Sequence, residues 1–116
     1  MIHPKIEIAN KSLTPKLYQD LIVQLNKDFL LSGIDKKIDF ECRPENFFKQ
    51  LFDVIDNLVK NNYQTFNQFM YTLDVSENKV ANIDETDFAK LVNKLTLLVL
   101  ERLVQKVYLK DQFKNY

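Results

Sequence analysis

The chain of 116 residues contains one glycine, Gly33, and three prolines, and it has no tryptophan. Tight β-hairpin turns depend on glycine, so this scarcity leaves little chemistry for a sheet built from consecutive hairpins. It also leaves long stretches of the chain free of helix breakers. The composition therefore favours an all-α fold.

Cysteine and histidine are equally scarce, with Cys42 and His3 as the only residues of each type. One cysteine cannot form a disulfide within the chain, and one of each residue cannot complete a structural zinc site or a di-metal bundle. Gly33 alone cannot furnish a glycine-rich phosphate loop. We therefore expect no metal and no cofactor, and we expect Cys42 to be a small buried hydrophobe.

Net charge and long apolar runs are also missing. Sixteen basic residues balance 16 acidic ones, so no overall field attracts nucleic acid or anionic lipid. No apolar run approaches the ~20 residues that cross a bilayer, and the first residues lack the apolar core of a signal peptide. We expect a single helical domain over residues 1–116, located in the cytoplasm, with no membrane contact.

Four segments repeat apolar residues at helical spacing. Thr14 and Asp84 are suited to cap helix starts, Gly33 to end a helix in a left-handed turn, and the pair Asn61-Asn62 to break one. We expect an antiparallel four-helix bundle-like domain with a long C-terminal helix and an extended N-terminal arm. The expected ranges are about 1–12 for the arm and about 14–32, 44–61, 63–74 and 84–110 for the helices.

Besides the break at Asn61-Asn62, two longer connections join these helices. Residues 35–43 alternate apolar and charged side chains, and we interpret them as a connector whose Ile38 and Phe40 close one end of the bundle. We predict that the stretch after the third helix is a loop with one helical turn that begins at Ser76.

The last helix carries two apolar faces. Leu91, Val92, Leu95, Leu98 and Val99 share one direction, whereas Leu100, Leu103, Val104 and Val107 share a second direction about 130° further round the helix. If the first face packs on the other helices, a short chain has few further segments that could cover the second face. The sequence therefore predicts a contact with a second copy or another protein, and the candidate interface is Leu97, Leu100, Val104 and Tyr108.

The sequence supports catalysis or nucleic-acid binding less well than it supports a protein contact. Asp53 and Asp56 have the spacing of a carboxylate pair, but they lie on the polar side of their helix, which is typical of a solvated face. The cations Arg102, Lys106, Lys110 and Lys114 near the C-terminus are expected from the helix dipole alone, so nucleic acid is an improbable partner. We predict that the protein is not an enzyme.

The leading hypothesis is a non-enzymatic helical protein–protein interaction module that self-associates through its C-terminal helix. The alternative is a small helical protein that holds an apolar ligand between Phe-rich helices. The candidate lining residues for that ligand are Phe47, Phe52, Tyr63, Phe66 and Phe69.

Overall fold

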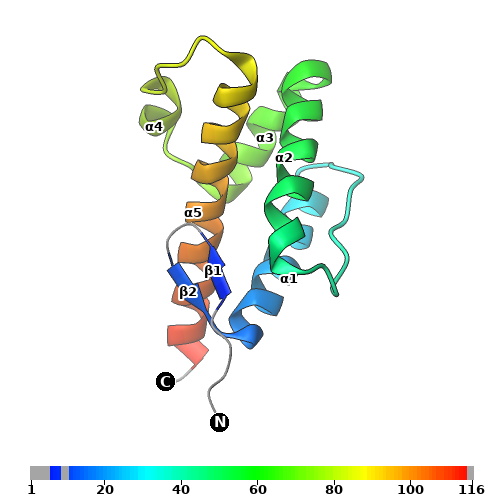
Figure 1. Cartoon of the computed structure of the whole chain (residues 1–116), viewed down its shortest axis with the longest axis vertical. Helices are drawn as coiled ribbons and strands as arrows, with labels where there is room; N and C mark the ends of the chain where they lie inside the picture. Colours follow the sequence, from blue (N-terminus) through cyan, green and yellow to red (C-terminus); the bar gives the residue numbers. More distant parts are fainter. Residues whose placement is uncertain (1–5, 9–10, 115–116) are drawn as a thin grey trace.

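The computed structural model of the protein describes residues 6–8 and 11–114. Its elements, in chain order, are β1 (Ile6–Ile8), β2 (Lys11–Leu13), α1 (Pro15–Leu31), α2 (Pro44–Asn61), α3 (Tyr63–Leu73), α4 (Glu77–Ala81) and α5 (Phe88–Lys114). Figure 1 shows α5 running along the length of the molecule, with α1 and α2 packed against it and the short α4 standing to one side. The expected all-α fold with a long C-terminal helix is confirmed, and α4 supplies the single turn expected after Ser76.

Both ends of α1 follow the signals in the sequence. The Thr14 side chain accepts a hydrogen bond from the Leu17 amide at 3.2 Å. At the other end Gly33 has a φ of 77°, and the Ile34 amide donates to the Phe29 carbonyl at 2.9 Å. These contacts form the predicted glycine-terminated turn, because glycine adopts this left-handed conformation with the least strain.

The predicted break between α2 and α3 is also confirmed. The Asn62 amide donates to the Leu58 carbonyl at 2.8 Å and so ends α2. The side chain of Asn62 then accepts from the Thr65 amide at 3.2 Å and so caps α3. One residue serves both helices because asparagine tolerates a non-helical backbone and offers a local acceptor.

The start of α5 differs from the prediction. Asp87, and not Asp84, caps this helix, since the Asp87 carboxylate accepts from the Lys90 amide at 3.0 Å. Glu85 accepts from the Asp87 amide at 3.2 Å and pairs with Lys94 at 3.3 Å. The segment offers several acidic residues that could cap, and local chemistry alone does not choose between them.

The predicted arm contains an antiparallel hairpin, in which Glu7 pairs with Ser12. Ile8 and Leu13 are buried in the core, so the hairpin is docked on the helices. The scarcity of glycine argued against hairpins, but this one is small and its apolar side chains are covered by the bundle. The first five residues, including His3, lie outside the described part of the chain.

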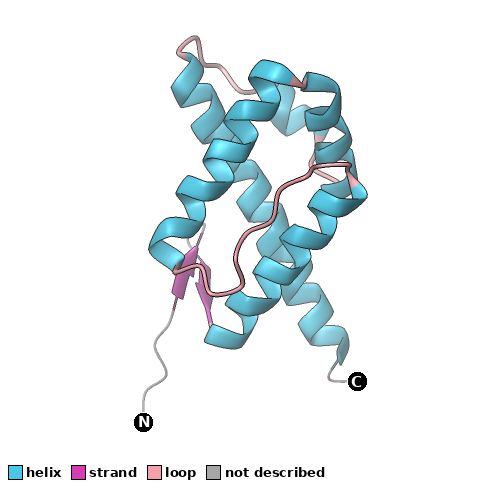
Figure 2. Ribbon diagram, turned by 90° about the vertical axis from the view of Figure 1, so that its right-hand side faces the viewer, coloured by secondary structure: helices cyan, strands magenta, loops and turns pink. Residues whose placement is uncertain are grey.

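The connector between α1 and α2 crosses the face of the bundle in Figure 2. The Asn26 side chain holds it by accepting from the Ile38 amide at 2.8 Å and donating to the Ile38 carbonyl at 2.9 Å. Ile38 is buried as predicted, whereas Phe40 is 50% exposed, contrary to the prediction. A turn in which the Cys42 amide donates to the Asp39 carbonyl interrupts the alternation and directs Phe40 outward.

Candidate functional site

The two faces predicted for the C-terminal helix exist, but both are buried within the domain. The first half of α5 buries Val92, Leu95 and Val99, and the second half buries Leu100, Leu103, Val104 and Val107. Of the four candidate interface residues, Leu100 and Val104 are each only 2% exposed, Tyr108 is half-buried, and Leu97 is 41% exposed. These four residues therefore do not form one continuous exposed patch.

The N-terminal hairpin and α1 lie against the second half of α5. Figure 1 shows the hairpin alongside this part of the helix, and the Tyr108 hydroxyl donates a hydrogen bond to the Ser12 carbonyl. The expectation that a short chain leaves this face uncovered was wrong, because it counted only the other helices as cover and not the extended N-terminal arm. Any partner surface must use side chains that the hairpin and α1 leave open.

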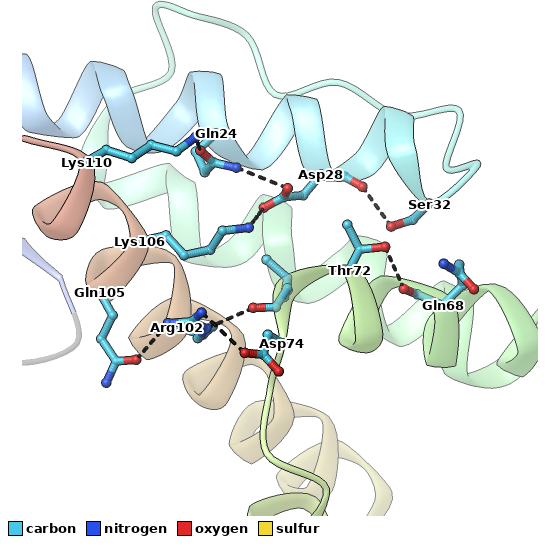
Figure 3. Close-up of polar contacts among 11 residues, drawn as sticks. Gln24, Asp28, Ser32, Gln68, Thr72, Asp74, Arg102, Gln105, Lys106 and Lys110 are labelled. Carbon is cyan, nitrogen blue, oxygen red and sulfur yellow. Dashed lines mark hydrogen bonds and ion pairs between the residues drawn. The ribbon is translucent and has the colours of Figure 1, made fainter. Parts of the chain in front are cut away.

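A buried polar cluster fastens α5 to α1 (Figure 3). The Asp28 side chain, in a residue only 1% exposed, pairs with the Lys106 ammonium at 2.9 Å. Gln24 donates to the Asp28 carboxylate at 3.1 Å and accepts from Lys110. A buried carboxylate is tolerated only when it is paired and hydrogen-bonded, so this cluster constrains how the two helices align.

The same contacts occupy the cations that suggested a nucleic-acid patch. Besides Lys106 and Lys110, Arg102 donates to the Leu73 carbonyl at 2.9 Å and lies 3.6 Å from the Asp74 carboxylate. Arg102, Lys106 and Lys110 thus serve contacts between α5 and the segments packed against it. The side chain of Lys114 lies outside the described part of the chain.

One side of the second half of α5 remains open as a groove of about 740 Å³, which we call the α5 groove. Its walls come from the hairpin and from α4, and α5 forms its floor. The lining residues are Lys11, Lys79, Glu101, Val104, Gln105, Tyr108, Leu109 and Gln112. A smaller hollow of about 230 Å³ shares Lys79, Glu101 and Gln105 and extends the groove to Leu98. Together they follow α5 from 98 to 112, roughly 20 Å of helix.

A second hollow, of about 880 Å³, lies between α3 and α4. Its α3 wall carries amide side chains and the aromatic ring of Tyr71, which is 80% exposed. Met70, Val75 and Val80 supply its apolar part. This surface was not predicted, although the polar and uncharged side chains of its α3 wall are visible in the sequence. Asp74 and Glu77 also border the hollow.

The aromatic residues assigned to an apolar ligand are mostly packed. Phe47, Phe66 and Phe69 are fully buried, and the rings of Phe29 and Phe69 pack at an angle of 41° with centroids 5.3 Å apart. Tyr63 is exposed. Of the five candidate residues, only Phe66 borders a hollow described above, so the arrangement of these rings is accounted for by core packing.

The remaining candidate groups have ordinary surroundings. Asp53 and Asp56 pair with Lys49 and Lys60, at 3.4 Å and 3.0 Å, as expected for a polar helix face. Cys42 is buried, as predicted. Across residues 6–8 and 11–114, no three His, Cys, Asp or Glu side chains group to hold a metal ion. None of the described helices is long and apolar enough to cross a membrane.

One buried hydroxyl has a strongly shifted acidity. Tyr18 donates a hydrogen bond to the Cys42 carbonyl at 2.6 Å. Burial, followed by the nearby Cys42 and Glu45 side chains, raises the pKa of Tyr18 far above its ordinary value of 10.0. A tyrosine with such a pKa holds its proton and is suited to a structural role, not to acid–base chemistry near neutral pH.

No family model, curated protein or solved structure matches this chain. The functional proposal therefore rests on the surfaces described above.

Proposed function

We propose that the protein is a non-enzymatic helical module that binds other polypeptides, with the α5 groove as the contact for a segment of a partner protein. The observation that carries this proposal is that the α5 floor, which also carries Glu101, Gln105 and Gln112, leaves apolar side chains open to solvent. Leu109 is 48% exposed there, beside the half-buried Tyr108 and above the buried Val104. Open apolar floors between two polar walls are typical of surfaces that bind peptides.

The shape of the groove favours one helix or one extended strand as its occupant. A concave surface of this length matches a convex segment of a few helical turns. Because two grooves facing each other would leave space between them, self-association through the groove fits less well than a partner segment does.

The charges on the walls define the chemistry of the partner. Lys11 of the hairpin and Lys79 of α4 border the groove, and neither has an ion pair within the described part of the chain. Glu101, on the α5 floor, also borders the groove, so the two cations lie on the walls and a carboxylate lies on the floor. We expect the partner segment to combine apolar anchors with carboxylates at its edges.

Selection of peptides from a displayed random library tests this function. Peptides of about 16 residues span about 24 Å as a helix, which covers the groove. We expect peptides selected on the wild type to carry apolar and acidic residues, and to bind Leu109→Glu about tenfold more weakly or worse. The matched control is Leu30→Glu, which makes the same change at a leucine of α1 that is 79% exposed, against 48% for Leu109. Binding of every selected peptide that is unchanged by Leu109→Glu would contradict the proposal.

The sequence also predicts self-association, and a second copy of the chain is the other partner that we propose. Its contact must differ from the second face of α5, which the domain buries. We expect both interactions to occur in the cytosol, because a single buried cysteine offers no disulfide for an oxidising compartment.

A further inference from the structure

The stretch 61–73, which includes all of α3, contains no charged residue, although 28% of the whole chain is charged. The exposed side of α3 is nevertheless polar. It carries Tyr63, Gln64, Asn67, Gln68 and Tyr71, which we call the α3 face. By contrast, the preceding helix α2 presents ion pairs such as Lys49 with Asp53 to solvent.

This composition is that of a contact surface. A helix that faces only water usually carries charged side chains on its outer side. Interfaces between proteins are depleted of charge and enriched in tyrosine and methionine. The α3 face combines exposed tyrosines and amides, and α3 itself carries no charged residue, whereas the hollow beside it is bordered by the carboxylates of Asp74 and Glu77.

We propose that the α3 face binds the α3 face of a second copy, antiparallel and across a twofold axis at Asn67. This proposal rests on the self-association included in the proposed function. Near a twofold axis each side chain meets its own copy, so a charged residue would face a like charge. An amide group both donates and accepts hydrogen bonds, so Asn67 complements itself.

The spacing of the exposed residues fits this arrangement. Tyr63, Asn67 and Tyr71 follow one another at intervals of four and form a ridge along α3. An antiparallel pair centred on Asn67 sets Tyr63 of each copy level with Tyr71 of the other.

The hollow between α3 and α4 provides room for the second copy. It measures about 880 Å³ and adjoins the ridge, with Met70, Val75 and Val80 in its apolar part. A tyrosine ring of the second copy enters this hollow, which would bury apolar area that α3 and α4 leave open. One short helix per copy makes a small interface, so we expect dissociation in the micromolar range.

Sedimentation velocity with charge variants at the twofold position tests the proposal. We expect wild type to dimerise, and Asn67→Asp and Asn67→Lys each to weaken the dimer about tenfold or more, because each places like charges at the axis. An equimolar mixture of the two variants should dimerise again, since Asp then faces Lys. The control Asn57→Asp makes the same chemical change on the exposed side of α2 and should leave dimerisation unchanged. Circular dichroism should show wild-type helicity in every variant.

Three results would overturn the proposal. A wild type that stays monomeric at high micromolar concentration removes self-association. A dimer that survives both charge variants places the second copy elsewhere on the molecule. A dimer that both variants split but the mixture does not restore shows that Asn67 does not meet its own copy. None of these results depends on the α5 groove, whose peptide binding is measured separately with Leu109→Glu.

Discussion

The two halves of the molecule are held together by different kinds of polar contact. In the hairpin half, formed by the hairpin, α1 and the second half of α5, two of the contacts are buried, Asp28 with Lys106 and Tyr18 with the Cys42 carbonyl, while Lys16 with Asp111 is exposed. In the opposite half, where α2 ends and α5 begins, they are more exposed. There Lys60 pairs with Asp56 at 3.0 Å and lies 5.3 Å from the centre of the Phe88 ring.

This difference indicates where the fold is specified most strictly. A buried polar group that loses its partner keeps the full cost of desolvation, whereas an exposed one regains water. The hairpin half should therefore tolerate few polar substitutions, and the opposite half should tolerate many. The same strictness explains why the second face of α5 is unsuited to a partner, because the domain itself depends on it.

The largest effect is expected from a charge placed in the hairpin half. Val104→Glu buries a carboxylate without a partner and should cost about 4 kcal/mol or more, a large part of the stability of a small domain. The melting temperature should fall by more than about 10 °C in circular dichroism. Leu97→Glu makes a similar change at an exposed position of the same helix and should change the melting temperature little. Equal melting temperatures for the two variants would show that the second face is not core.

The next largest effect is expected from breaking the buried ion pair. Lys106→Met leaves the Asp28 carboxylate buried without its cation and should lower the free energy of unfolding in urea by about 3–5 kcal/mol. Adding Asp28→Leu should recover most of this loss, because no unpaired charge then remains. Lys60→Met removes an exposed cation in the opposite half and should cost about 1 kcal/mol or less. Similar losses at both lysines would remove the distinction between the halves.

A smaller effect is expected at Tyr18. Tyr18→Phe leaves the Cys42 carbonyl without its donor and should cost about 1–3 kcal/mol at neutral pH. Because the pKa of Tyr18 is raised in the fold, its contribution is fully present below pH 10.0 and is lost as pH rises above that value. Wild type should therefore lose more stability than Tyr18→Phe between pH 9 and pH 11, by roughly 1 kcal/mol. Parallel pH profiles in urea denaturation would refute this assignment.

The sequence predicts helix ends well where one residue carries the signal. Thr14, Gly33 and Asn62 each act through a hydrogen bond or a backbone conformation within a few residues, so their effects can be inferred without the fold. Asp84 and Asp87 show the limit, because two acceptors compete and tertiary contacts choose between them. Phe40 shows another limit of prediction from the sequence. The turn between Asp39 and Cys42 directs the Phe40 side chain to solvent, although the alternation predicts that it is buried.

Contacts between distant segments were not predictable in this way. Asp28 and Lys106 are 78 residues apart, and nothing in either local sequence pairs them. The candidate interface depended on the same kind of information, because the burial of Leu100 and Val104 depends on segments far away in the chain. The two faces of α5 were correctly predicted from periodicity, but what covers each face was not. The uncharged α3 face is visible in the composition of 61–73, but apolar periodicity does not reveal it.

Hydrogen exchange at several protein concentrations tests most directly whether the chain itself covers the second face of α5. We predict that the amides of residues 100–107 are protected as strongly as those of residues 92–99, and that dilution well below micromolar concentration leaves this protection unchanged. Protection supplied by a second copy would instead fall as the dimer dissociates. Selective loss of protection at residues 100–107 on dilution would contradict the account and would return the second face of α5 to the role of an interface.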